Sequence, residues 1–181
     1  LLLSALQIAN VQVAGADRMQ LAEQIEIQDL LALGDVMNLA DDDLQLAAVL
    51  KSPLFGMSED QLYELAYDRG KASLMSRLMA HRGADGDLGK MADQLARWQS
   101  RAEYESVFGF FSFVLVDGGR QKFRDRLGCA VDESLDHFLN LAQNFALGGG
   151  VSLLEFLTSI RSSGGEVKRD MDASGTDEVR I

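Results

Sequence analysis

Four basic side chains lie within seven residues of one another and are the first candidates for chemistry in this sequence. The segment reads GGRQKFRDRLG, and its cations are Arg120, Lys122, Arg124 and Arg126. On a helix, Arg120 and Arg124 share one face, and Lys122 and Arg126 share another. In so acidic a chain this cluster is the best place for contact with a phosphate backbone. The alternative is a solvated helix whose cations pair with neighbouring acids, and spacing alone slightly favours that alternative.

The only proline of the chain predicts a rigid corner between two helices. Pro53 disfavours helix at the residue before it, and Gly56 can adopt a positive φ angle. Ser58 and Gln61 have the spacing of a capping box, in which each side chain bonds the backbone amide of the other residue. The segment SPLFGMSEDQ therefore predicts a helix end, a tight turn and a helix start.

No catalytic residue, cofactor site or metal site is predicted. The glycines at 148–150 lack the Lys and Ser or Thr that follow in a phosphate-binding loop, and they predict a helix end and turn instead. His81 and His137 are far apart in sequence and have no ligand partner at helical spacing. The single cysteine, Cys129, excludes an intrachain disulfide and is expected to be buried or half-buried.

Composition is that of an ordinary globular domain with an acidic balance. The 181 residues suit one domain, and 17 Lys and Arg against 28 Asp and Glu give a net charge of −11. This balance argues against a surface that is basic all over, but it is compatible with a local basic strip. No apolar run approaches the ~20 residues of a membrane span.

Helical periodicity runs through most of the chain. An apolar stripe begins at Ile27, and the acids Asp41–Asp43 are placed to cap the helix that follows them. The run VFGFFSFVLV is rich in residues that favour strands, but the stripe that begins at Tyr104 has helical spacing and favours helix. Further helices are expected at Ala72–Ala80, Leu88–Arg101, Tyr104–Val116, Arg120–Leu127 and Val131–Ala146, and a last one at the capping box of Ser152 and Glu155.

The predicted fold class is mainly α, a multi-helix orthogonal bundle with short β segments at the two chain ends. The β segments are NVQVAG near the start and EVRI at the end, and neither has an obvious partner strand nearby. Because an isolated strand leaves its backbone groups unpaired, we expect a fragment of a larger protein whose sheet is mostly missing.

One longer segment, EIQDLLALGDVMNLADDDLQLAAVLKSPLFGMS, resembles the accessory "2B" region of UvrD/Rep-type superfamily 1 DNA helicases. That family carries an E-I-x-D segment, a long helix, an acidic cap, a second helix and a P-x-x-G corner. The matching positions here are Glu26, Ile27, Asp29, Asp42, Asp43, Pro53 and Gly56. Upstream, VQVAGADRM resembles the strand and turn that lead into the insert, and DEVRI resembles the strand that enters the T-x-H-x-x-K-G-L-E motif.

Within this family, the first third and both ends of the chain look most like AddA-type, RecB-like helicase–nuclease subunits. The middle, from Ala72 to Gly150, resembles them mainly through its helical pattern and its basic cluster. Three positions depart from the family pattern. Ser58 takes the place of the final glycine of the corner, Phe55 that of a basic residue, and Asp35 that of an arginine.

The resemblance implies residues 1–22 at the edge of a second motor domain, a helical accessory domain at 23–165, and a return linker and strand at 166–181. It implies an accessory domain that guides duplex or junction DNA, or regulates an ATP-dependent helicase in unwinding and double-strand break repair. The DNA-contact candidates are Lys51, Gly56, Ser58, Arg120, Lys122, Arg124 and Arg126.

The fragment itself is expected to be inactive and to hold no cofactor, whereas ATP and magnesium are expected for the parent helicase, which can also carry a nuclease. The resemblance also implies a partner nuclease or helicase subunit. It further implies a cytoplasmic, nucleoid-associated location in a bacterium, without a membrane. The alternative is a helical protein–protein docking module that makes no direct contact with DNA, and the acidic balance of the chain slightly favours it.

Overall fold

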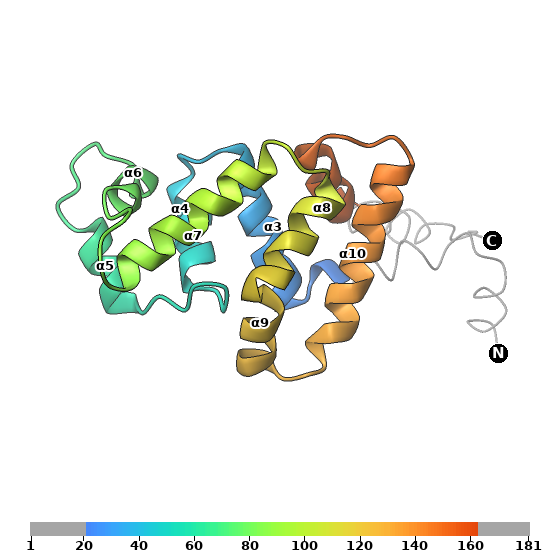
Figure 1. Cartoon of the computed structure of the whole chain (residues 1–181), viewed down its shortest axis with the longest axis horizontal. Coiled ribbons are helices and arrows are strands. Elements are labelled where there is room, and N and C mark those ends of the chain that lie inside the picture. Colours follow the sequence, from blue (N-terminus) through green and yellow to red (C-terminus); the bar gives the residue numbers. More distant parts are fainter. Residues whose placement is uncertain (1–20, 163–181) are drawn as a thin grey trace, which may run out of the picture.

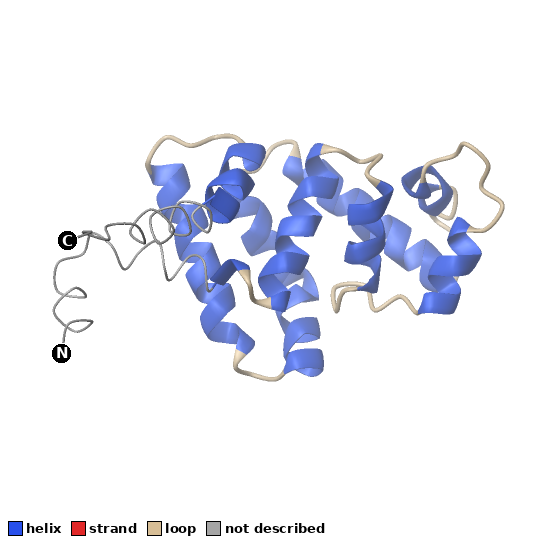
Figure 2. Cartoon of the chain, turned by 180° about the vertical axis from the view of Figure 1, so that it is seen from behind, coloured by secondary structure: helices blue, strands red, loops and turns tan. Residues whose placement is uncertain are grey.

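The computed structural model describes residues 21–162, and every regular element in that part of the chain is a helix (Figures 1 and 2). The mainly helical class is therefore confirmed. No strand occurs between residues 21 and 162, and both predicted β segments, at 10–15 and 178–181, lie outside the described residues. The helices are α3 (Ile25–Asn38), α4 (Asp43–Lys51), α5 (Glu59–Ala66), α6 (Leu74–Met79), α7 (Asp87–Ala102), α8 (Val107–Val114), the π-helical η1 (Leu115–Gly119), α9 (Arg120–Leu127), α10 (Val131–Leu147) and a final helical segment at 153–162.

The helices lie in a row, with α5 and α6 at one end and α8, α9 and α10 toward the other (Figure 1). The long helix α7 runs from the α5–α6 end toward α8, and α3 lies between α4 and α10. α3 supplies much of the core, since Ile27, Leu30 and Leu33 are all fully buried. Among residues 21–162, no helix combines the length and the apolar composition needed to cross a bilayer.

Side-chain caps start the helices where the sequence predicts them. The carboxylate of Asp42 accepts hydrogen bonds from the amides of Leu44 and Gln45, both at 3.1 Å. Ser58 forms the complete capping box with Gln61. Such caps satisfy amides that the first helical turn leaves without a partner, and each contributes about 1 kcal/mol. They fix where α4 and α5 begin and thereby where the corner between them lies.

The segment around VFGFFSFVLV is helical, as the apolar spacing predicts. Its helix, α8, begins later than expected, because Ser106 caps it through a bond from the amide of Gly109. Tyr104 therefore lies before the helix and is 83% exposed, so its assignment to the apolar face was wrong. Cys129, between α9 and α10, is exposed and not buried as expected.

An aromatic cluster joins the helices at the α10 end of the molecule. The ring centres of Phe111 on α8 and Phe138 on α10 lie 4.9 Å apart in an edge-to-face arrangement. Phe138 lies 5.5 Å from Phe156 in the segment 153–162. All three rings are almost fully buried, and packing of this kind favours helix over strand for the aromatic-rich run of α8.

A kink between α8 and α9 directs α9 toward the proline corner. Within η1, Asp117 and Gly118 leave helical geometry, and Gly118 has a φ of +100°. The carboxylate of Asp117 accepts a hydrogen bond from the indole Nε1 of the fully buried Trp98 at 2.9 Å. The Trp98 ring in turn packs edge-to-face on Phe55, with 5.3 Å between ring centres. α7, the kink and the corner thus share one packed contact.

Candidate nucleic-acid interface

The corner between α4 and α5 is closed by its own backbone hydrogen bonds. The amide of Gly56 donates to the carbonyl of Ser52 at 2.7 Å, and the amide of Met57 donates to that of Leu50 at 2.9 Å. Gly56 has a φ of +67°, a conformation that favours glycine. The predicted helix end, turn and helix start are therefore confirmed as a rigid corner.

Five of the seven predicted contact residues line one cavity at this corner. The cavity measures about 500 Å³. Its lining joins the corner to α9 and includes Lys51, Gly56, Ser58, Lys122 and Arg126. Asp125 contributes the acid among these residues, so three cations face one carboxylate. A concave surface with this charge suits a phosphate group or another small anion.

Lys122 is the residue that connects α9 to the corner. Its Nζ donates to the carbonyl of Leu54 at 2.5 Å and to Oε1 of Gln94 at 3.2 Å. The ammonium also lies 5.8 Å from the ring centre of Phe55. Burial lowers the pKa of Lys122, and the nearby carboxylate of Asp117 opposes that shift. Because an ammonium group has three donors, these two bonds leave one N–H of Lys122 without an acceptor among residues 21–162 and available to an anion.

The other two cations of the cavity differ in their neighbours. Lys51 forms an ion pair with Glu59, whose side chain is 76% exposed. Solvent screening keeps an exposed pair of this kind weak, at less than about 1 kcal/mol. The side chain of Arg126 is exposed and makes no hydrogen bond or ion pair with any residue between 21 and 162. Both cations can therefore reach an incoming anion at little cost.

Two backbone amides at the start of α5 are available beside the cations. The capping box uses the amides of Ser58 and Gln61, and the amide of Gly56 closes the turn. The amides of Glu59 and Asp60 have no acceptor within the described part of the chain. Their donors and the positive end of the helix dipole favour an anion, whereas the side chains of the same two residues oppose one.

The remaining two predicted contacts, Arg120 and Arg124, lie on the other face of α9 and contact α10. The Nε atom of Arg124 donates to both carboxylate oxygens of Asp132, at 2.9 and 2.8 Å. Arg120 bonds Asp132 at 3.0 Å and Asp136 at 2.5 Å. The hydrogen bond from Arg124, and then that from Arg120, holds the pKa of Asp132 below its ordinary value. The two arginines therefore hold α9 against α10 through ion pairs.

The acidic side chains of α3, including those of the matched E-I-x-D segment, also interact with other groups of the fold. Glu26 is buried, and its carboxylate accepts a hydrogen bond from the hydroxyl of Ser134 on α10. Burial, together with the charge of Glu26, raises the pKa of Asp29 to about 6. Asp35, where the helicase family has arginine, forms a two-point ion pair with Arg161. Glu26 thus connects α3 to α10, and Asp35 connects it to the segment 153–162.

Sequence reasoning missed the contribution of α7 to this region. Lys90 and Gln94 line a second, adjoining cavity together with Phe55, Gly56 and Lys122. Their spacing of four residues puts both on one face of a helix, which is the only signal that the sequence carries. Nothing in that spacing predicts that this face meets a corner about 40 residues earlier in the chain.

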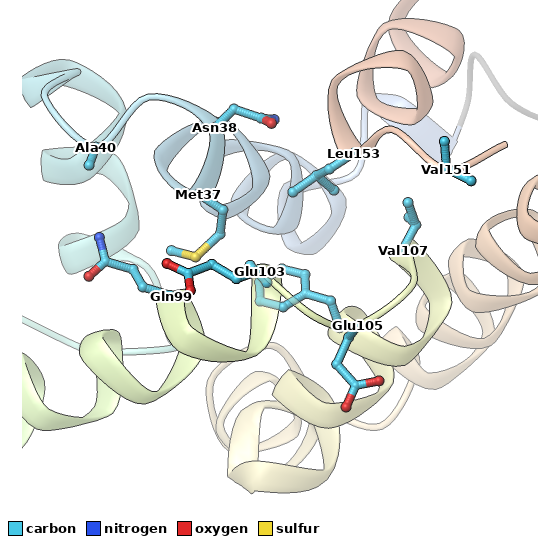
Figure 3. A pocket seen from close by; sticks show the side chains of 11 residues that line it. Met37, Asn38, Ala40, Gln99, Glu103, Glu105, Val107, Val151 and Leu153 are labelled. Carbon is cyan, nitrogen blue, oxygen red and sulfur yellow. The ribbon is translucent and has the colours of Figure 1, made fainter.

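A further hollow lies away from the corner, between α3, the end of α7 and the start of α8 (Figure 3). It measures about 560 Å³, and Met37, Phe110 and Leu153 are among its apolar lining residues. Glu103 and Glu105 also line it. No group of three or more His, Cys, Asp or Glu side chains between residues 21 and 162 is arranged to hold a metal ion.

Comparison with known proteins relates the chain to one kind of protein, the A subunit of an ATP-dependent helicase/nuclease. The chain is 29% identical over 98 residues to this protein of Thermoanaerobacter sp. (strain X514), and equally to that of Thermoanaerobacter pseudethanolicus. The aligned region covers 52% of this chain and 8% of each relative. The protein of the same name from Listeria innocua is 23% identical over 134 residues, which cover 65% of this chain and 11% of that protein.

These similarities support a relationship to helicase–nuclease A subunits, which are the AddA-type proteins that the sequence resembles. The chain spans only about a tenth of the length of these relatives. No protein-family model matches the chain.

Proposed function

We propose that residues 23–165 form an accessory domain of an AddA/UvrD-like DNA helicase, equivalent to its 2B region, and that the α4–α5 corner contacts DNA phosphates. The observation that carries this proposal is the convergence of Lys51, Lys122 and Arg126 on one cavity, beside two amides that have no acceptor in the described part of the chain. These donors come from segments about 70 residues apart in the sequence. A compact group of such donors would contact DNA phosphates and would not recognise the base sequence.

The departures of this corner from the helicase pattern do not remove its charge. Phe55 replaces a basic residue of the family, and its ring packs on Trp98. Lys122, from α9, brings an ammonium to within 5.8 Å of that ring. A cation from a distant helix thus lies close to the position where the family has one from the corner itself. We infer that this replacement preserves phosphate contact.

The role of the whole protein follows from the resemblance. We propose a bacterial, cytoplasmic and nucleoid-associated parent that unwinds DNA in double-strand break repair and recombination. ATP and magnesium would serve its motor, and the parent can include a nuclease and act with a partner subunit. The present domain would guide duplex or junction DNA, or regulate the motor, by rotating about connections near Asp17–Glu26 and Glu166–Asp177.

The proposal is tested by titrating the 181-residue protein into a fluorescently labelled DNA duplex of random sequence at several salt concentrations. Each phosphate contact contributes about −0.9 to the slope of log K against log salt. We expect a clearly negative slope for the wild type. The double variant Lys51→Glu, Arg126→Glu should lose roughly 10- to 100-fold in affinity at low salt. Absent or salt-independent binding by the wild type would overturn the proposal.

A docking role without DNA is the second candidate, and the hollow in Figure 3 is the observation that favours it. Glu105 already pairs with Arg101, so the apolar lining together with Glu103 fits a partner segment that combines an apolar side chain with a basic one. Under this alternative, Glu103→Lys would abolish binding of the partner protein, and the Lys51→Glu, Arg126→Glu variant would bind it normally.

A further inference from the structure

A second cavity adjoins the corner cavity. It measures about 400 Å³ and shares Gly56 and Lys122 with the first. Phe55 lines it from the corner, and Lys90 and Gln94 are among the residues that line it from α7. We propose that this second cavity holds a neighbouring phosphate of the same nucleic-acid strand, with Lys90 as its cation. This inference rests on the proposed function and extends it to a residue that the helicase resemblance does not include.

Lys90 is available for an anion. Its side chain is exposed and makes no hydrogen bond or ion pair with the part of the protein that the structure describes. Asp87, one turn earlier on α7, is the acid in the lining of this cavity. With Lys122 shared between the cavities, two cations face one carboxylate here, so the local charge favours an anion.

Gln94 lines the second cavity and bonds Lys122, which lines both. Oε1 of Gln94 accepts from Nζ of Lys122 at 3.2 Å, which fixes the direction of the ammonium. Nε2 of Gln94 is a buried donor without a hydrogen-bond partner among the described residues. A buried donor left unpaired is costly. A phosphate oxygen brought into this cavity supplies an acceptor on the side that Gln94 and Lys90 line.

The two cavities together favour an extended anion over a single one. A DNA strand carries one phosphate for about every 3.4 Å along the helix axis. Because the cavities share Gly56 and Lys122, a strand that crosses the corner passes both of them. A single phosphate would occupy only one cavity. Either Lys90 or the pair Lys51 and Arg126 would then remain without an anion. The geometry therefore points to the phosphodiester backbone of a nucleic-acid strand as the ligand.

The test is the salt dependence of duplex binding by the 181-residue protein with Lys90→Gln. Removal of one contact should make the slope of log K against log salt shallower by about 0.9. The matched control is Lys71→Gln, which removes an equal charge from an exposed loop between α5 and α6. If only long-range attraction matters, both variants will change the slope equally.

The outcomes separate this inference from the proposed function. If the wild type shows no salt-dependent binding, the DNA function fails and the second cavity fails with it. If the wild type binds and Lys51→Gln weakens it, but Lys90→Gln matches Lys71→Gln, the DNA function survives and only the second cavity is overturned. A loss of slope with Lys90→Gln and none with Lys71→Gln supports both.

Discussion

The two faces of α9 carry the same kind of charge and differ in what lies opposite them. On one face, Arg120 and Arg124 meet Asp132 and Asp136 of α10. On the other, Lys122 and Arg126 line a cavity with the proline corner. In the first case the positive charge is used inside the fold, and in the second it remains available. The number of cations in a segment therefore says less about binding than the acids that neighbouring helices place beside them.

The same contrast extends to the helices behind each face. Behind the α10 face, Glu26 of α3 bonds Ser134, so acidic groups connect helices there. Behind the corner, Trp98 is fully buried in the core, and its indole N–H, the only polar group of the side chain, donates a hydrogen bond to Asp117. We expect substitutions on the α10 side to change stability and substitutions at the corner to change binding. Each prediction below tests one side of that division.

The largest expected effect on stability is at Asp29, on the α10 side. Its pKa of about 6 exceeds its ordinary value of 3.8, so the folded protein holds a proton that the unfolded chain has lost between these two pH values. The stabilisation that comes from holding this proton is therefore fully present below about pH 3.8, and it is lost as the pH rises through about 6. Because Asp29 is only partly buried, solvent screening reduces the effect, and Asp29→Asn should stabilise the protein at pH 7 by about 1 kcal/mol.

Urea unfolding of Asp29→Asn across this pH range provides the measurement. The gain should vanish at acid pH, and DNA affinity should not change. Asp41→Asn, at an exposed acid whose side chain makes no hydrogen bond or ion pair in the described part, is the control and should leave stability nearly unaltered. An equal gain at acid and neutral pH would contradict the burial of a titrating carboxyl at position 29.

A smaller effect is expected at Asp132, the acceptor shared by Arg120 and Arg124. The pKa of this carboxyl is lowered, so its contribution to stability is present above its ordinary value and is lost as the pH falls through its folded value. Asp132→Asn should lower the Tm at pH 7 by a few degrees, and the difference should disappear in acid. Arg120 keeps its ion pair with Asp136, and both arginines lie on the face of α9 away from the corner cavity, so duplex affinity should change no more than the loss of one negative charge causes.

Thermal melts over a pH series and duplex binding at low salt check the Asp132→Asn prediction together. Glu133→Gln is a suitable control, because this neighbouring acid makes no contact that would be lost within residues 21–162. A Tm of Asp132→Asn equal to that of the control would mean that the arginine pairs do not hold α9 to α10.

The sequence predicts local structure well where short-range rules decide it. The bounds expected for α9 agree with the structure, and both the capping box of Ser58 and the turn after α10 are confirmed. These features depend on caps, glycines and apolar spacing within a few residues. The start of α8 was placed too early, because Tyr104 continues the apolar spacing but lies before the Ser106 cap.

The candidate site is predictable only in part. Spacing correctly separates Arg120 and Arg124 from Lys122 and Arg126, but it carries no information on which pair meets acids. That choice depends on the position of α10. The bond from Lys122 to Leu54 spans 68 residues, and Lys90 reaches the region from a third helix. Such contacts arise from tertiary packing, which local patterns do not encode.

The smallest expected effect is at Glu59, which pairs with Lys51 at the corner. Glu59→Gln should free the ammonium and remove an acid beside the cavity, and duplex affinity should rise about two- to threefold at low salt. Because the pair is exposed, stability should fall by less than about 0.5 kcal/mol. Fluorescence anisotropy titration measures the affinity, and Glu64→Gln, an exposed acid further along α5, should leave it unchanged.

The most direct test compares Arg124→Gln with Arg126→Gln, the same substitution two residues apart on one helix. Arg126→Gln should make the salt slope of duplex binding shallower by about 0.9 and leave the Tm unchanged. Arg124→Gln should lower the Tm and leave the slope unchanged. Equal slopes for the two variants, or a loss of slope confined to Arg124→Gln, would contradict the assignment of binding to the corner face of α9.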